Sequence, residues 1–421
     1  MDKLLIRGGK ALRGEVEISG AKNAALPIMA ATILSPGLNT LYNIPDLKDI
    51  KTMSTVLESM GGKVARADED GALMINTEGV ETVEAPYELV KTMRASVLTL
   101  GPLMARFGYA RVSMPGGCAI GARPINLHLM GLEKMGAEIT LSQGYVVARA
   151  ERLKGADINF DTVTVTGTEN LMMAAVLANG VTRLENAARE PEVCDLAGVL
   201  IQMGAHITGV GTPLIEIEGV NELKPANYRI IPDRIETGTF LAFAGITGGD
   251  ILIKNCEVTH IGSLIKKFME AGLNINEEAG GLRVIGPHAG ILKAAEVATS
   301  PYPGFPTDMQ AQLMALMCVA DGTSIIRETI FENRFMHAAE LRRMGANIEV
   351  EDNLAIVKGV NKLLGAQVMA TDLRASASLV VAALAAEGET IIDRIYHLDR
   401  GYEKIEYKLS KLGADIHRVS A

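Results

Sequence analysis

One cysteine in a glycine-rich segment is the feature of the sequence that most directly suggests chemistry. Cys118 lies in Arg111-Val-Ser-Met-Pro-Gly-Gly-Cys-Ala-Ile-Gly-Ala-Arg123, with an arginine on each side of it. Nearby cations lower the pKa of a thiol from about 8.5 toward neutrality, so that the sulfur can donate a proton or act as a nucleophile near pH 7. The alternative is an incidental thiol in a flexible surface loop. The residue types favour a reactive thiol at Cys118.

The other three cysteines have a different setting. Cys318 lies in the apolar run Met-Ala-Leu-Met-Cys-Val-Ala, and Cys194 and Cys256 occur singly in short mixed stretches. We interpret all three as small buried hydrophobic side chains. Four cysteines without paired spacing are typical of reduced thiols in the cytoplasm, which is where we expect the protein.

Polar residues also stand at the beginnings of apolar, helix-like segments. They are Lys22 with Asn23, Arg94, Glu169 with Asn170, Glu236 with Thr237, Asp308, and Asp372 with Arg374. Helix N-termini carry unpaired N–H groups and a partial positive charge, which bind phosphate and carboxylate. A lysine or arginine there opposes the helix dipole unless an anion is present. We therefore expect the helix starts to converge on one cationic cleft.

Several of these residues also have a simpler interpretation. Asp308 and Asp372 can equally be N-caps of the helices that follow them. We interpret His128, in Arg123-Pro-Ile-Asn-Leu-His128, as structural.

Three further charged residues lie outside the helix starts. Glu190 and Glu192 are expected to form a solvated turn and the acidic first turn of a helix. Arg400, in Leu-Asp-Arg-Gly-Tyr, is expected in a loop after a strand, where it can act as a mobile cation.

The elements that must position these residues repeat six times along the chain. A short motif such as Met-Gly-Ala ends an amphipathic stretch in each repeat, and its glycines are spaced 68 to 75 residues apart. They are Gly61, Gly136, Gly204, Gly272, Gly345 and Gly413. Apolar stretches end in a second series, at Gly37, Gly108, Gly180, Gly249, Gly322 and Gly388. Glycine after a helix is the expected stop signal, so each series marks one helix per repeat.

Each repeat is predicted to run strand, helix, strand, helix and then a strand pair. The first helix of each repeat is apolar on nearly all sides and is therefore expected to be buried: Ala24–Leu34, Ala95–Ala105, Leu171–Ala178, Phe240–Ile246, Met314–Ala320 and Ala377–Ala385. The sequence thus predicts an α/β protein of six βαβαββ repeats in two groups of three. We place one domain at 21–231, with the cysteine loop, and the other at 1–20 plus 232–421. The strand Lys3–Ile6 is expected to join the second group.

Composition excludes several classes of function. The 421 residues carry a net charge of −9, contain no tryptophan and show no basic stripe, so a nucleic-acid partner is not expected. Seven scattered histidines give no metal-ligand spacing, and neither a metal nor another cofactor is expected. No signal-peptide core and no apolar run of about 18 residues is found, so we expect no membrane segment. Nothing predicts an obligate protein partner.

Four motifs together resemble one family. They are Lys22-Asn23, Pro-Gly-Gly-Cys118-Ala-Ile-Gly-Ala-Arg123-Pro, Phe305-Pro-Thr-Asp308-Met-Gln and Thr371-Asp372-Leu-Arg374-Ala. The stretch Ile330-Phe-Glu-Asn-Arg-Phe-Met336 and the closing Asp399-Arg400-Gly-Tyr also fit, and the resemblance extends from residue 3 to 417. In these motifs the sequence is similar to the UDP-N-acetylglucosamine 1-carboxyvinyltransferases, the enolpyruvyl transferases that open bacterial peptidoglycan synthesis.

The resemblance implies a fold and a reaction. The fold is a two-domain inside-out α/β barrel of the EPSP synthase-like type, in which buried helices face a cleft. The reaction transfers the enolpyruvyl group of phosphoenolpyruvate to the 3′-hydroxyl of UDP-N-acetylglucosamine and releases phosphate. These two small molecules are the implied partners. The antibiotic fosfomycin, which alkylates this family's cysteine, is expected to inactivate the protein.

The resemblance also implies roles for matched residues. Cys118 is the implied general acid and can form a covalent phosphoenolpyruvate adduct, and Asp308 is the implied base. Lys22, Arg123 and Arg400 are implied to hold phosphoenolpyruvate and the leaving phosphate. The implied substrate-binding residues also include Asn23, Arg94, Asp372 and Arg374, the segment Arg123, Pro124, Ile125, Asn126 and Leu127, the segment Thr162, Val163, Thr164 and Val165, and Ile330.

The sequence departs from the family pattern in two places. Family members often have Arg-Pro-x-Asp-Leu where this chain has Asn126, which removes a negative charge. Many also show Ser-Val-Gly-Ala-Thr where this chain has Thr164-Val-Thr-Gly-Thr168. Both departures concern nucleotide binding more than the chemical step.

Three alternatives remain at this point. A 3-phosphoshikimate enolpyruvyl transferase would share the fold, but the cysteine loop disfavours it. A non-catalytic sugar-nucleotide binding protein would not need Cys118, Asp308, Lys22 and Arg400 together. A cysteine hydrolase would need a histidine–acid partner for Cys118, and the sequence shows none.

Overall fold

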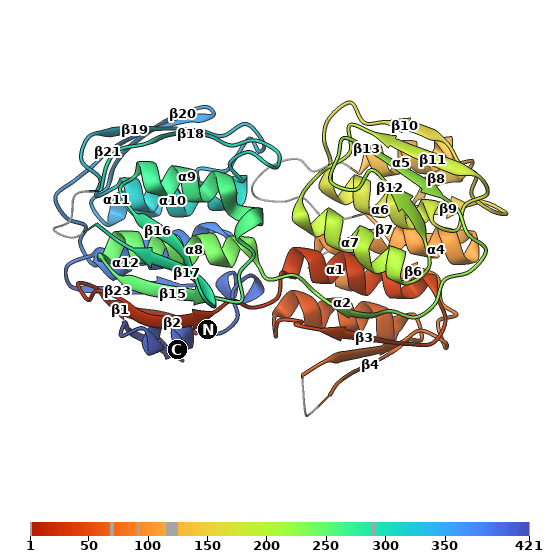
Figure 1. Ribbon diagram of the computed structural model, residues 1–421, viewed down its shortest axis with the longest axis horizontal. Helices are drawn as coiled ribbons and strands as arrows, with labels where there is room; N and C mark the ends of the chain where they lie inside the picture. Colours follow the sequence, from red (N-terminus) through yellow and green to blue (C-terminus); the bar gives the residue numbers. More distant parts are fainter. Residues whose placement is uncertain (1, 68–70, 91–92, 115–124, 288–291, 421) are drawn as a thin grey trace. The chain divides into compact units, whose positions relative to one another are not determined.

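The computed structural model describes residues 2–67, 71–90, 93–114, 125–287 and 292–420. These residues divide into two compact units. The central unit comprises Gly20–Gly117 and Arg123–Ile231, and the terminal unit comprises Met1–Ser19 and Pro232–Ala421. Figure 1 labels many of the helices and strands of both units.

The central unit alternates strands and helices. Its strands are β3 (Leu38–Tyr42), β4 (Lys63–Arg66), β5 (Leu73–Asn76), β6 (Glu84–Ala85), β7 (Tyr109–Ser113), β8 (Glu138–Ser142), β9 (Tyr145–Arg149), β10 (Asp157–Asn159), β11 (Val181–Glu185), β12 (His206–Thr208), β13 (Leu214–Glu218) and β14 (Asn227–Arg229). Its helices are α1 (Lys22–Ala31), η1 (Thr32–Leu34), α2 (Lys48–Ser59), α3 (Tyr87–Val90), η2 (Arg94–Thr99), α4 (Leu100–Phe107), α5 (Asn126–Lys134), α6 (Val165–Ala175) and α7 (Pro191–Gln202), where η marks a 3-10 helix.

The terminal unit has the same alternation. Its strands are β1 (Lys3–Arg7), β2 (Arg13–Glu17), β15 (Asp250–Lys254), β16 (Asn274–Glu278), β17 (Gly281–Ile285), β18 (Glu296–Ala298), β19 (Thr323–Arg327), β20 (Asn347–Glu351), β21 (Leu354–Lys358), β22 (Gln367–Met369), β23 (Glu389–Asp393) and β24 (Asp415–Val419). Its helices are α8 (Arg234–Thr247), η3 (Val258–Ile261), α9 (Gly262–Glu270), η4 (Thr307–Met309), α10 (Gln310–Met317), α11 (His337–Arg343), α12 (Ala375–Ala385), η5 (Leu398–Arg400) and α13 (Ile405–Lys411).

The sheets of both units follow one pattern. Within the described residues there are six sheets of four strands, three in each unit. In each sheet one outer pair is parallel, and the other two pairings are antiparallel, as in β10-β11-β13-β12. A parallel pair requires a crossover, and a helix supplies it, as α6 does between β10 and β11. The predicted βαβαββ repeat and its six copies are confirmed.

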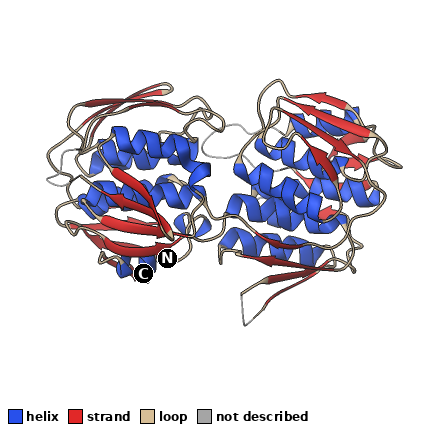
Figure 2. Ribbon diagram, in the orientation of Figure 1, coloured by secondary structure: helices blue, strands red, loops and turns tan. Residues whose placement is uncertain are grey.

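The first helix of each repeat is buried, as its composition predicted. In α8, α10 and α12 of the terminal unit nearly every residue is buried, and these three helices pack against one another. In the central unit α1 and α6 are equally enclosed, and α4 packs against α6. Figure 2 shows the helices of each unit lying between its sheets. A helix with no polar face has no side to present to water, which explains the inside-out arrangement.

Strands from distant parts of the chain close both units. The N-terminal strand β1 pairs with β23 and β24 in the terminal unit, as expected, and β2 pairs with β15. In the central unit β14, which follows the third repeat, pairs with β3 of the first repeat. Each unit is therefore completed by a strand that lies far from its sheet in sequence.

The glycines that marked the repeats end helices in the left-handed conformation. All six of the first series have positive φ angles, between 90° and 110°. In the second series Gly249 is the exception, and the preceding Gly248 takes the left-handed position after α8 with φ of 58°. Among the described residues, no helix is long and apolar enough to cross a membrane.

Truncating β1 should destabilise the terminal unit strongly. Leu4 is fully buried between β23 and β24, so Leu4→Ala should lower the free energy of unfolding by about 2–5 kcal/mol. The neighbouring Leu5 points to the other face and is only half-buried, so Leu5→Ala should cost clearly less. Urea denaturation of both variants tests this. Equal losses would contradict the one-sided burial of β1.

Candidate active site

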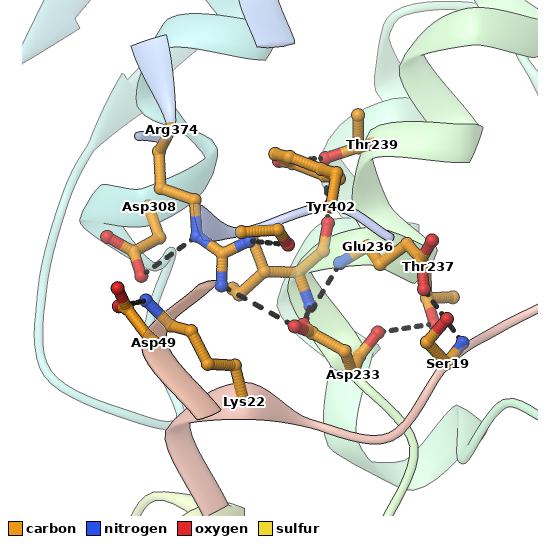
Figure 3. Close-up of polar contacts among 12 residues, drawn as sticks. Ser19, Lys22, Asp49, Asp233, Glu236, Thr237, Thr239, Asp308, Arg374 and Tyr402 are labelled. Carbon is orange, nitrogen blue, oxygen red and sulfur yellow. Dashed lines mark hydrogen bonds and ion pairs between the residues drawn. The ribbon is translucent and has the colours of Figure 1, made fainter. Parts of the chain in front are cut away.

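Lys22, the first residue of α1, makes an ion pair inside the central unit. Its Nζ lies 3.1 Å from Oδ2 of Asp49, and the two side chains are 9% and 5% exposed (Figure 3). Asp49 lies in the first turn of α2, where the helix dipole favours a carboxylate. The anion that a lysine at a helix start requires is thus supplied, at least in part, by the protein itself. Sequence reasoning missed Asp49 because it lies 27 residues away.

The other predicted residues of the central unit also lie at helix starts. Asn23 follows Lys22 in α1, and Arg94 begins η2. Ile125 is the N-cap residue of α5, and Asn126 and Leu127 are its first two residues.

The second predicted nucleotide segment leads into α6. Thr162 and Val163 are exposed just before the helix, and Thr164 is its N-cap, whose hydroxyl accepts a hydrogen bond of 3.2 Å from the backbone N of Gly167. Val165 is the first helical residue.

In the terminal unit Asp308 lies between two arginines. Its Oδ1 accepts a hydrogen bond of 2.8 Å from Nη2 of Arg334. Its Oδ2 lies 3.6 Å from Nε of Arg374, as Figure 3 shows. Both guanidinium groups are 4% exposed, whereas the Asp308 side chain is 28% exposed. Asp308 is therefore an ion-paired group rather than an N-cap. Arg334 was not singled out from the sequence, although it lies in a stretch that matched the family.

Arg374 is held by several further groups. Its Nη2 lies 3.5 Å from Oδ2 of Asp233, its Nη1 donates to the carbonyl oxygen of Gly401 at 3.4 Å, and its guanidinium lies 5.3 Å from the ring centre of Tyr402. Burial alone would lower the pKa of Arg374, but Asp233, Tyr402 and Asp308 raise it above its ordinary value. Arg374 is thus a fixed, buried cation.

The remaining predicted residues of the terminal unit occupy three different positions. Oδ1 of Asp372 accepts hydrogen bonds of 2.9 Å from the backbone N atoms of Arg374 and Ala375, so Asp372 caps α12. Arg400 ends the short helix η5, and the prediction of a loop there was wrong, because residues 398–400 form one helical turn. Ile330 is 37% exposed after β19.

A buried carboxylate connects the segments of Asp308 and Ile330. Glu328 is 1% exposed. Its Oε2 accepts a hydrogen bond of 2.9 Å from Oγ1 of Thr307, and its Oε1 accepts one of 2.8 Å from the backbone N of Ile330. Oγ1 of Thr299 also donates to Oε1, at 2.9 Å. No pattern in the sequence indicated this role, because it depends on contacts among three separate segments.

Glu192 lies in the acidic first turn of a helix, α7, as predicted, but the expectation of a solvated turn at Glu190 was wrong. Their exposures are 9% and 3%, because the first turn of α7 packs into the central unit. Both lie close enough to Glu169 of α6 to affect its titration. Burial first, and then these two neighbouring carboxylates, raise the pKa of Glu169 well above its usual range.

The cysteine loop itself lies outside the described residues. This holds for Cys118, Arg123 and Pro124, whose predicted roles therefore remain predictions. Cys318 is buried, as predicted, whereas Cys194 and Cys256 are only half-buried. Burial raises the pKa of Cys318 to about 12, and burial is also the main cause of the raised pKa values of Cys194 and Cys256. Among the described residues, no group of three or more histidine, cysteine, aspartate or glutamate side chains is placed to hold a metal ion.

Comparison with known proteins decides the family. The family described as EPSP synthase (3-phosphoshikimate 1-carboxyvinyltransferase) matches residues 6–409. A protein of Thermodesulfovibrio yellowstonii named UDP-N-acetylglucosamine 1-carboxyvinyltransferase is 63% identical over 420 residues, and one of Myxococcus xanthus with the same name is 60% identical over 422 residues. Both alignments cover 100% of each chain. The chain belongs to the UDP-N-acetylglucosamine 1-carboxyvinyltransferase family.

Solved structures agree with this family. The enolpyruvyl transferase NikO from Streptomyces tendae matches with a TM-score of 0.89 at 27% identity, covering 100% of this chain and 99% of that one. EPSP synthase from Acinetobacter baumannii matches with a TM-score of 0.76 at 18% identity, covering both chains fully, which supports the fold alone. The predicted EPSP synthase-like fold is confirmed.

Thiol labelling should distinguish Cys118 from the other cysteines. At pH 7 iodoacetamide should modify Cys118 rapidly in the native protein, because the other three thiols have raised pKa values and are largely protonated. Peptide mass spectrometry locates the label. Cys118→Ala should abolish the fast phase, and the matched variant Cys194→Ala should retain it. Fast labelling that survives in Cys118→Ala would refute a special reactivity of this residue.

The buried His128 should make the central unit sensitive to acid. Burial first, and then the charge of Arg94, lower the pKa of His128 from 6.5 to about 4. Between these values the unfolded chain binds a proton that the folded protein does not, so stability is lost as the pH falls from 6.5 toward 4. The full effect is on the order of 3 kcal/mol. Unfolding measured at pH 7 and pH 5 should show a smaller loss for His128→Phe than for the natural chain. Equal losses would contradict the lowered pKa.

Proposed function

We propose that this protein transfers the enolpyruvyl group of phosphoenolpyruvate to the 3′-hydroxyl of UDP-N-acetylglucosamine and releases phosphate. The observation that carries the proposal is the 63% identity, over the whole chain, to a relative named for this reaction. The clustered Asp308, Arg334 and Arg374 supply charged groups of the kind that this chemistry needs. The substrates follow from the relatives' names and from the motifs of the sequence.

The reaction requires an addition and then an elimination. In the addition, C3 of phosphoenolpyruvate takes up a proton while the sugar oxygen bonds to C2 and its hydroxyl proton leaves. In the elimination, C3 loses a proton, the double bond re-forms and phosphate departs. We assign Cys118 as the acid that protonates C3 and as the site of a covalent phosphoenolpyruvate adduct. Positioned proton transfer of this kind contributes about 10²–10⁴-fold to the rate.

We assign Asp308 as the base for the sugar hydroxyl. Its carboxylate is partly exposed, and the hydrogen bond from Arg334 fixes one of its oxygens. Glu328 supports this geometry, since it binds the neighbouring Thr307. A base must be held within hydrogen-bonding distance of the proton that it accepts. The contacts with Arg334 and Thr307 would hold Asp308 in such a position.

The carboxylate and phosphate of phosphoenolpyruvate must be bound by cationic side chains whose N–H groups are not all hydrogen-bonded within the protein. Among the described residues, Nη1 of Arg334 is buried without a hydrogen-bond partner, and Nη2 of Arg374 has only the ion pair with Asp233, at 3.5 Å. Guanidinium donors of this kind suit a carboxylate, because both groups are planar. We assign Lys22, Arg123 and Arg400 to phosphoenolpyruvate and the leaving phosphate. Fixed cations there would stabilise the charge that develops as phosphate leaves.

We assign the nucleotide and sugar contacts mainly to helix starts. They are Asn23, Arg94, the segments 123–127 and 162–165, Ile330, Asp372 and Arg374. We further propose that the reaction takes place in the cytoplasm as the first committed step of peptidoglycan synthesis, on which cell shape and division depend. Fosfomycin is proposed to inhibit it by alkylating Cys118.

Phosphate release tests the proposal. With phosphoenolpyruvate and UDP-N-acetylglucosamine the protein should release phosphate, and with shikimate 3-phosphate as acceptor it should not. Cys118→Ala and Asp308→Asn should each lower kcat by about 10²–10⁴-fold. The matched variant Asp352→Asn changes an exposed turn residue of the terminal unit and should leave the rate unchanged.

The acceptor assay separates the alternatives. Release with shikimate 3-phosphate alone would assign the chain to the sister activity. Binding of UDP-N-acetylglucosamine without any release would instead indicate a non-catalytic binding protein.

A further inference from the structure

An arginine of the last strand lies on the buried face of its sheet. Arg418 belongs to β24, an edge strand, and stands opposite Leu4 of β1. Residues directly opposite each other share a face, and side chains two positions apart along a strand do so as well. Arg418 therefore lies on the same face as Leu4 and Ile416, which are 0% and 3% exposed. A charged side chain on such a face needs partners within the protein.

The guanidinium group of Arg418 binds both carboxylate oxygens of Asp399. Its Nη1 donates to Oδ2 at 3.0 Å, and its Nη2 donates to Oδ1 at 2.5 Å. The remaining nitrogen, Nε, donates to Oε1 of Glu406 at 2.7 Å, in the first turn of α13. A two-point pair between arginine and a carboxylate fixes the direction of both groups as well as their distance. Arg418 therefore holds Asp399 in one orientation.

Asp399 is the direct neighbour of Arg400 in a single helical turn. The short helix η5 comprises only Leu398–Arg400, and Leu398 is 1% exposed, so one side of the turn is packed in the core. A 3-10 helix has three residues per turn, so consecutive side chains leave it about 120° apart. The ion pair at Asp399 thus sets the rotation of the turn, and with it the direction in which Arg400 leaves.

The chain that follows the turn is held by other contacts. The carbonyl oxygen of Gly401 accepts a hydrogen bond of 3.4 Å from Nη1 of Arg374. The hydroxyl of Tyr402, which is 1% exposed, lies 2.9 Å from Oγ1 of Thr239. These contacts do not involve Arg418. Without Arg418 the segment should therefore stay folded, while the orientation of η5 becomes less well defined.

Two residues with left-handed backbone flank the segment. Arg394, directly after β23, has a φ angle of 58°, and Lys404, directly before α13, has one of 45°. Residues with a side chain adopt this conformation at a cost in free energy, and it persists only where surrounding contacts hold the chain. The segment 395–403 thus depends on contacts with other elements, and Arg418 supplies such a contact at the turn itself.

We propose that Arg418 is a positioning residue for phosphoenolpyruvate: through Asp399 it orients η5 so that Arg400 meets the anionic groups of this substrate. The inference rests on the function proposed above, in which Arg400 binds phosphoenolpyruvate and the leaving phosphate. The side chains of Arg418 and Asp399 are 29% and 35% exposed, and ion pairs as exposed as this contribute little to folding. Orientation of the turn explains the two-point geometry better than stability does.

Steady-state kinetics of phosphate release tests the inference. Arg418→Ala should lower kcat/KM for phosphoenolpyruvate by about 10–100-fold, since misplacing a binding group by about 1 Å can cost about 10². Arg418→Lys keeps the charge, but an ammonium group lacks the planar fork, so this variant should recover only part of the loss. The Kd of UDP-N-acetylglucosamine, measured without phosphoenolpyruvate, and the melting temperature should change little in either variant.

Arg283 of β17 provides a matched control. Its Nε and Nη2 donate to the two carboxylate oxygens of Asp250, at 2.9 and 2.8 Å, and its Nη1 lies 3.7 Å from Oε2 of Glu278. This is the same two-point pair with an additional glutamate, in the same unit, but on a strand that carries no residue assigned to the reaction. Arg283→Ala should therefore leave kcat/KM for phosphoenolpyruvate unchanged.

A double-mutant cycle with Arg400→Ala tests the route of the effect. If Arg418 acts through Arg400, Arg418→Ala should cause no further loss of kcat/KM once Arg400 is absent. Additive losses would contradict the positioning role. Asp399→Asn weakens the same pair from the other side and should reproduce the effect of Arg418→Ala, so the test does not depend on the folding of one variant.

The outcomes separate this inference from the proposed function. If the natural chain releases no phosphate from phosphoenolpyruvate and UDP-N-acetylglucosamine, the proposed function fails. If the natural chain is active and Arg418→Ala and Asp399→Asn are equally active, the inference fails while the function stands. Full recovery in Arg418→Lys, or an equal loss in Arg283→Ala, would show that orientation by the planar pair is not the cause and would also overturn the inference.

Discussion

The structure depends on helices that are buried on nearly every side. Helices such as α8 and α12 have no polar face, so sheets must cover them, and one four-stranded sheet is built for each repeat. Polar side chains can then be accommodated mainly at the helix ends. This places Lys22 and the cap Asp372 at helix starts and Asp308 just before α10, and it explains why charged groups gather at these ends.

Ion pairs offset the free-energy cost of burying charged side chains at these helix ends. Burying an unpaired ion costs several kcal/mol, and the chain pairs Lys22 with Asp49 and Arg374 with Asp233 and Asp308. These pairs do not use every donor, since Nη1 of Arg334 is buried without a hydrogen-bond partner among the described residues, and Nη2 of Arg374 makes only the 3.5 Å ion pair with Asp233. Such groups are expensive for stability alone. Their presence is explained if an anionic substrate completes them.

Much of the fold could be predicted from the sequence, because the glycine series and the apolar helices are local signals. The helix starts that carry Lys22 and Asp372 could be predicted for the same reason. The residues that contact these helix starts could not be predicted in this way. Asp49 and Glu328 act through contacts between separate segments, and the burial of Glu190 follows from the packing of α7, which no local pattern reveals.

Enolpyruvyl transfer by addition and elimination requires that C3 of phosphoenolpyruvate gains and then loses a proton during each transfer. The most direct measurement is therefore the mass of the enolpyruvyl product formed from phosphoenolpyruvate and UDP-N-acetylglucosamine in deuterated water. Addition followed by elimination passes through a methyl group with one solvent-derived hydrogen, so the product's vinyl group should contain deuterium. A product formed at the normal rate without deuterium would contradict protonation at C3 and, with it, the role assigned to Cys118.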